Sequence, residues 1–183
     1  IGPVGLERHV KALCLIAPNL TFDIHFIEVS AEGQVIKTDS LIIYPFRVRH
    51  GIPCLGFRFE LPREGKFDKE KALKNNVPMK VWSKLQHEPQ AEYDGIVYTA
   101  DMVLGEQRKG LKVTYTTDTR PTAGIIRNAE NSDLLICEGM FGEDDKLERA
   151  KETGHMLFSE AAEIARQANV RQLWLTHYSP SLD

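Results

Sequence analysis

The spacing of hydrophobic and polar positions predicts a helix, a group of strands and then a regular alternation of the two. Between Leu6 and Ile16 apolar residues recur near helical spacing. Strand-like runs follow at 22–29, 35–36, 41–48 and 55–61. From residue 111, strands at 112–116, 133–138 and 172–176 alternate with helices at 123–130, 144–153 and 159–169. This order predicts an α/β domain whose chemistry lies in the loops after the strands.

The stretch between Pro62 and Gly110 has a different character. Charge rises, the apolar periodicity weakens, and Pro62 is expected to end the preceding strand. Short helices at 68–75 and 80–85 and a small hairpin near 93–99 are predicted. We expect residues 62–110 to form an inserted, flexible arm that protrudes from a single domain spanning 1–183. A plain surface insertion is the alternative.

Composition limits the classes of function. A net charge of −3 excludes a broadly basic surface, so any nucleic acid would be contacted through local basic patches. Three cysteines without a CxxC pair are typical of a reduced, cytoplasmic protein. No run approaches the ~18 apolar residues of a membrane span. There is no signal peptide, and both ends of the chain look cut, so we expect a partial domain.

Three predicted strands each deliver a candidate metal ligand. His50 follows the run 41–48, Asp118 follows 112–116, and His177 follows 172–176. Because the carboxyl ends of such strands gather at one edge of a sheet, the three side chains suggest one shared metal site. Imidazole nitrogen and carboxylate oxygen suit zinc, and Asp118 could bridge two ions. A buried histidine at 177 and a turn or helix-cap aspartate at 118 are the simpler alternatives.

Two further residues could take part in proton transfer. His155 lies just before the helix at 159–169, where it could donate a proton to a leaving group. Glu138 ends a very apolar strand and therefore needs a partner, for which His155 is a candidate. A loop histidine without a role is the alternative for His155. Cys137 is expected to be a buried core residue rather than a nucleophile.

Several short motifs occur in a recognisable order. Residues 1–7 (IGPVGLE) are similar to Y-G-P-x-G-[IL], and His50-Gly51 is followed by GFR at 56–58. LGEQRKG at 104–110, TDTRP at 117–121, Glu138 with Phe141, His155 with the AAEIA helix, and THYS at 176–179 come next. By these motifs the chain resembles the ribonuclease Z family, the tRNA 3′-processing endonucleases of the metallo-β-lactamase fold.

The resemblance implies a fold, an activity and a set of site residues. The fold would be an αββα sandwich whose amino-terminal part is absent, with an exosite-like arm. His50, Asp118 and His177 would be zinc ligands in a two-zinc site, and His155, supported by Glu138, would assist the leaving 3′ oxygen. The activity would remove the 3′ trailer from precursor tRNA and leave a 3′ hydroxyl. A homodimer and no membrane association are also implied.

Substrate contacts are expected mainly in the inserted arm. By the same resemblance, Lys66, Lys69, Lys80 and Lys84 would contact tRNA phosphates, and Arg120 would contact substrate near the site. A solvated helix surface is the alternative for the lysines.

This chain departs from the family pattern at several points. The H-x-H-x-D-H motif does not occur in these residues, and we expect it upstream of Ile1. Val77-Pro78 replaces the Gly-Pro arm tip, while Cys137 and Met156 replace residues of the site loops. Two alternatives therefore stay open. One is a metallo-β-lactamase-fold phosphodiesterase or hydrolase with another substrate, and the other is an inactive partial domain.

Overall fold

The computed structural model describes residues 1–16, 19–30 and 33–179. The chain divides into two units. The main unit comprises Ile1–Leu61 and Leu111–Asp183, and the inserted unit comprises Pro62–Gly110. The boundaries of the inserted unit coincide with the change in charge and periodicity along the sequence.

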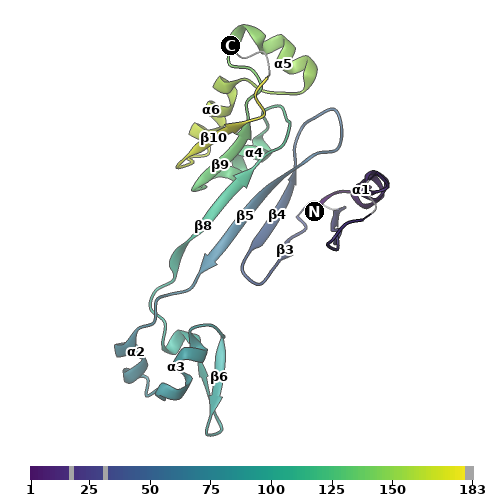
Figure 1. The fold of residues 1–183 in the computed structure, drawn as a ribbon. Coiled ribbons are helices and arrows are strands. Elements are labelled where there is room, and N and C mark those ends of the chain that lie inside the picture. The colour runs from purple at the N-terminus through teal and green to yellow at the C-terminus, as the bar shows by residue number, and fades with distance from the viewer. Residues whose placement is uncertain (17–18, 31–32, 180–183) are drawn as a thin grey trace. The chain divides into compact units, whose positions relative to one another are not determined.

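A six-stranded mixed sheet forms the centre of the main unit (Figure 1). Its strand order is β10-β9-β8-β5-β4-β3. The strands are β3 (Ile36–Lys37), β4 (Ile42–Arg47), β5 (Leu55–Arg63), β8 (Arg108–Tyr115), β9 (Leu134–Glu138) and β10 (Leu173–Thr176). Strands β8, β9 and β10 run parallel, whereas β3, β4 and β5 are antiparallel. Thr176 pairs with Glu138, so the ends of β9 and β10 are level and their loops begin at the same edge.

Helices complete the crossovers between the parallel strands. They are α4 (Ala123–Ala129), α5 (Leu147–Thr153) and α6 (Phe158–Gln167), with a short 3₁₀ turn, Asp144–Lys146, before α5. The side chain of Thr122 caps α4 by accepting a hydrogen bond from the backbone of Ile125. Gly154 ends α5 with a positive φ of 80°, a conformation that glycine adopts without steric cost.

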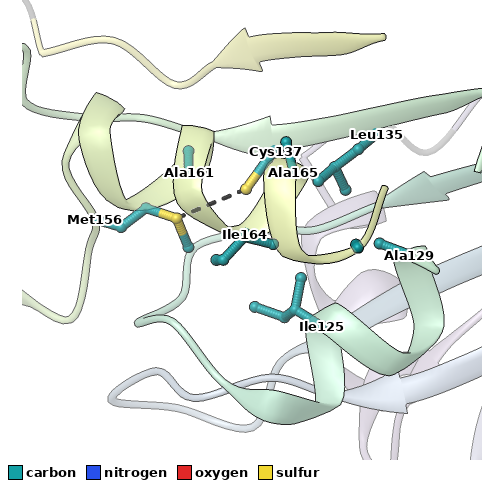
Figure 2. Packing of buried hydrophobic residues seen from close by; sticks show 9 residues of the cluster. Ile125, Ala129, Leu135, Cys137, Met156, Ala161, Ile164 and Ala165 are labelled. Atoms are coloured by element: carbon teal, nitrogen blue, oxygen red, sulfur yellow. Dashed lines mark hydrogen bonds between the residues drawn. The ribbon is translucent and has the colours of Figure 1, made fainter. Parts of the chain in front are cut away.

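The main hydrophobic core lies between α4, α6 and the sheet (Figure 2). Ile125 from α4, Leu135 from β9 and Ile164 from α6 meet there with little or no exposure. The small residues of α6 allow this helix to lie close to β9.

Cys137 is fully buried in the same cluster, and its Sγ lies 3.7 Å from Sδ of Met156. Burial raises the pKa of the Cys137 thiol to about 11, as expected for a packing residue rather than a nucleophile.

The amino-terminal segment forms less regular structure than its pattern suggests. The predicted opening helix is confirmed as α1 (Leu6–Cys14). The strand predicted at 22–29 is wrong for most of its length, because only β2 (Glu28–Val29) pairs, with the two-residue strand β1 (Gly2–Pro3). An alternating run becomes a strand only where a partner satisfies its backbone, and here the partner is two residues long.

The inserted unit contains α2 (Lys69–Lys74), α3 (Met79–Leu85) and the hairpin β6 (Gln90–Tyr93) and β7 (Ile96–Thr99), followed by a 3₁₀ turn at Ala100–Met102. Asp94 and Gly95 both have positive φ, as a two-residue hairpin turn requires. The unit has a hydrophobic core of its own, which includes Val81, Leu85 and Val103.

One further sequence expectation needs correction. Strand β5 does not stop at Pro62 but continues to Arg63, because the fixed φ of proline is compatible with extended backbone at a strand end. Within 1–16, 19–30 and 33–179, no helix is long and apolar enough to cross a membrane.

The separate core of the inserted unit predicts a local response to mutation. Leu85→Ala should reduce the free energy of unfolding of this unit by about 2–5 kcal/mol, because it opens a cavity in a small core. Hydrogen exchange at the amides of α3 and β6 would measure this loss. Leu73→Ala, at a position 55% exposed on α2, is the matched control and should have little effect. Equal effects of the two substitutions would show that the unit does not fold around this cluster.

Candidate metal centre

The main unit gathers four of the predicted site residues at one edge of its sheet. His50 lies in the loop after β4, Asp118 in the loop after β8, and His177 directly after β10. His155 lies between α5 and α6, in the crossover that leaves β9. The loops of His50, Asp118 and His177 each follow a strand, as expected for an α/β site, whereas the loop of His155 follows helix α5.

Three of the four side chains are close enough to share a ligand, and the fourth, His177, lies beside Asp118. Donor atoms of His50, Asp118 and His155 all lie within 4.8 Å of one another. Nε2 of His177 lies 3.6 Å from Oδ1 of Asp118. The ring of His155 is near both other imidazoles, with centroid distances of 5.2 Å to His50 and 5.1 Å to His177. The structure therefore brings together residues that are up to 127 positions apart in the chain (177 minus 50).

Hydrogen bonds orient two of the imidazoles. Nδ1 of His50 lies 3.2 Å from the carbonyl oxygen of Gly154, which can only accept, so Nδ1 carries the hydrogen. Nδ1 of His155 lies 3.2 Å from Oε1 of Glu138. In both residues Nε2 is left as the nitrogen that can face the cluster. A metal-binding histidine is usually held by such a contact at its other nitrogen.

Glu138 is a buried carboxylate that joins two of the site loops. Its side chain is 1% exposed. It accepts hydrogen bonds from the N–H of Thr119, beside Asp118, and from the N–H of Met156 at 3.2 Å, beside His155. Burial raises the pKa of the Glu138 carboxyl, while the two backbone N–H groups and His155 act in the opposite direction. The expected partnership of Glu138 with His155 is present in the structure.

The turn that carries His177 is also held in place. His177 has a φ of 63°, in the left-handed region that few residues other than glycine adopt. On one side, the N–H of Gly139 donates to the carbonyl of Thr176 at 2.9 Å. On the other, the N–H of Ser179 donates to the carbonyl of Met140 at 3.0 Å. These contacts fix an uncommon backbone conformation, which directs the imidazole toward Asp118.

The donor set fits a divalent metal such as zinc. Three imidazoles and one carboxylate are ordinary zinc ligands, and the distances among them allow one ion to contact several of them. Two tetrahedral ions would need more donors than these four side chains offer. A cleft of about 470 Å³, bordered by His50, Ile52, Pro53 and Arg47, lies beside the cluster.

Comparisons with known proteins agree with this geometry. The β-lactamase superfamily domain matches residues 75–178. The chain belongs to the metallo-β-lactamase superfamily. It is 53% identical over 182 residues to a ribonuclease Z of Lachnoclostridium phytofermentans and 51% identical to one of Lachnospira eligens. In both cases 100% of this chain and 60% of the relative are covered, so the chain spans about 60% of the length of these relatives.

Solved structures show the same fold. Human tRNase Z, short form, matches with a TM-score of 0.59 at 21% identity, over 97% of this chain and 59% of that one. The metallo-β-lactamase fold protein YhfI of Bacillus subtilis matches with a TM-score of 0.54 at 21% identity, over 96% of this chain and 49% of that one. The fold expected from the motifs is confirmed, and so is the resemblance to ribonuclease Z.

Predicted substrate-binding residues fall into two groups. Lys66, Lys69, Lys80 and Lys84 are exposed on the inserted unit. Lys80 donates to the hydroxyl of Tyr93 at 3.0 Å, and Lys84 pairs with Glu88 at 3.6 Å. Arg120 is different, because its side chain is only 13% exposed and its guanidinium bonds Glu160 and the carbonyl of His155.

Sequence reasoning did not identify Thr119 or Glu160 as part of the site. Thr119 lies inside the recognised TDTRP segment, but nothing in the pattern indicates that its N–H donates to Glu138. Glu160 lies in the first turn of α6 among small residues, where a carboxylate is ordinary as a helix-terminus residue. Its pairing with Arg120, 40 residues away, becomes visible only in the fold.

The contacts of Glu138 predict a stability effect that does not depend on metal. Glu138→Ala in metal-free protein should lower the free energy of unfolding by about 2–5 kcal/mol, because buried N–H donors lose their acceptor. Glu138→Gln should cost less, since the amide oxygen can still accept one of these hydrogen bonds. Urea denaturation would measure both, with the exposed Glu152→Ala as control. A Glu138→Ala variant as stable as this control would exclude the proposed role of Glu138 as a link between loops.

Proposed function

We propose that this chain is part of a zinc-dependent endoribonuclease that removes the 3′ trailer from precursor tRNA and leaves a 3′ hydroxyl. One observation supports this most strongly. A cluster of three histidines and an aspartate lies at the strand ends of a chain 53% identical to a ribonuclease Z over its whole length. Neither the side-chain cluster nor the sequence identity would suffice alone, because the fold accommodates several chemistries.

We assign His50, Asp118 and His177 as residues that would hold the metal, with the carboxylate of Asp118 central to the set. When bound, the metal would supply Lewis acidity and positive charge at a phosphodiester. We assign His155 to proton transfer, because Glu138 occupies its Nδ1 and leaves Nε2 to face the leaving oxygen. Glu138 would keep the imidazole oriented during the reaction.

The remaining metal ligands are proposed to come from an H-x-H-x-D-H segment, which the 183 residues lack. The proposed activity therefore belongs to a full-length protein of the relatives' size. Precursor tRNA as substrate, a homodimer and a cytoplasmic location are further parts of the proposal.

End-mapped cleavage of a 3′-extended precursor tRNA by the full-length protein tests the proposal. A single cut at the acceptor-stem junction, with a 3′ hydroxyl on the tRNA and loss of activity on chelation, is the expected result. Hydrolysis of a simple phosphodiester without tRNA cleavage would instead support another substrate for the same fold. Absence of both activities and of bound zinc would support an inactive domain.

Asp118→Ala should abolish cleavage and reduce the zinc content, because the substitution removes a carboxylate shared by the cluster. Steady-state rates and metal analysis of the purified full-length variant would show this. Asp145→Ala, on the exposed turn before α5, is the control and should retain both properties. Retention of a tenth of the wild-type rate would contradict the assignment, since it corresponds to a barrier change of only about 1.4 kcal/mol.

The exposed lysines of the inserted unit should act through phosphate contacts. Combined Lys66→Ala, Lys69→Ala and Lys80→Ala changes should weaken precursor binding and reduce the slope of log K against log salt by about 1 per lost contact. Titrations at several salt concentrations would measure the slope. The matched control replaces Lys37, Lys146 and Lys151 of the main unit, which removes the same net charge. Equal changes in both triple variants would indicate a general charge effect instead of contacts by the inserted unit.

A further inference from the structure

The guanidinium of Arg120 bonds the backbone of His155 and the carboxylate of Glu160. Its Nη1 donates to the carbonyl oxygen of His155 at 2.5 Å and to Oε2 of Glu160 at 2.8 Å. Its Nη2 donates to Oε1 of the same carboxylate. The two side chains are 13% and 21% exposed, so water competes little with these bonds. A bidentate arginine–carboxylate pair of this kind fixes the relative orientation of the two side chains as well as the distance between them.

Glu160 connects this pair to a rigid element. It lies in the first turn of α6, and its Oε2 also accepts from the N–H of Leu157 at 3.0 Å. The segment from His155 to Leu157 is thereby held from both ends. The carbonyl of His155 is bonded to Arg120, and the N–H of Leu157 is bonded to Glu160.

The backbone of Arg120 extends the same arrangement to the other site loops. Its N–H donates to the carbonyl of Arg49, the residue before His50, at 2.8 Å. The N–H of Arg49 in turn donates to the hydroxyl of Thr119 at 3.0 Å. Arg120 is thus one residue that joins the loops of His50, Asp118 and His155.

We propose that Arg120, through its pair with Glu160, is a positioning residue that holds the His155 imidazole against the metal cluster. The kinetic effect that we expect rests on the proposed function, whereas the geometric argument does not. Lysine could not replace arginine here, because a single ammonium cannot reach one carbonyl and both oxygens of a carboxylate in one plane. A substrate contact through this guanidinium would require it to leave Glu160 and His155.

Two readouts in the full-length protein test the proposal. In metal-free protein labelled with ¹⁵N-histidine, Arg120→Lys and Glu160→Gln should shift and broaden the His155 Nδ1–H resonance while those of His9, His25 and His87 stay in place. In the loaded enzyme acting on precursor tRNA, both variants should lower kcat by about 10- to 100-fold with KM changed less than about twofold. Glu163→Gln removes the other ion pair of α6, the exposed one with Arg166, and should change neither readout.

The opposite outcomes are equally specific. A raised KM with kcat preserved would show that Arg120 binds substrate directly, and unchanged His155 resonances would show that it does not position the ring. If Arg120→Lys does not fold, Glu160→Gln supports the same comparison with the guanidinium retained. If the wild-type protein does not cleave precursor tRNA, the proposed function fails, while the resonances of the metal-free protein still decide the positioning role.

Discussion

The site depends on one buried carboxylate. Glu138 ends an apolar strand, and a charge buried there would be costly without compensation, as its raised pKa reflects. The compensation comes from donors on two separate loops. One loop supplies the N–H of Thr119, and the other supplies the imidazole of His155 and the N–H of Met156. Because the carboxylate needs these donors, it also fixes the loops that carry Asp118 and His155. Burying the Glu138 carboxylate costs free energy, and only loop positions that place these donors around it recover that cost. The burial therefore makes the geometry of the site specific.

Parts of this arrangement follow from local patterns, and those parts were predictable. The period of α6 and the apolar run of β9 indicate their structures without any knowledge of neighbours. The Asp94-Gly95 turn is likewise a local signal, because both residues tolerate positive φ. The strand predicted at 22–29 is wrong for a reason that lies outside the local pattern. Alternation shows that a segment could pair, but pairing needs a partner, and β1 offers only two residues.

The candidate site was predictable only as far as strand ends could be recognised. His50, Asp118 and His177 each follow a strand, so their meeting follows from the topology of an α/β sheet. The partners of Arg120 could not be found in this way, since Glu160 lies 40 residues away on a helix whose pattern indicates packing alone. A charged residue near a site is readily interpreted as a substrate contact. In the structure, both Nη atoms of Arg120 donate hydrogen bonds within the protein.

The proposed role of His155 depends on which of its two nitrogens is engaged and on which other residues can hold the metal. Glu138 engages Nδ1, so Nε2 alone can face the cluster, and one nitrogen cannot hold a metal ion and carry a transferable proton at the same time. His155 lies among the donor atoms of His50 and Asp118, which would suit a ligand. His177, however, approaches Asp118 at 3.6 Å and can complete the ligand set without it. In the proposed assignment His177 is a ligand and His155 transfers the proton. The hydrogen bond from Arg120 to the backbone of His155 then has a reason. A ligand is oriented by its metal, whereas an acid that must meet a moving leaving group depends on the protein for its orientation.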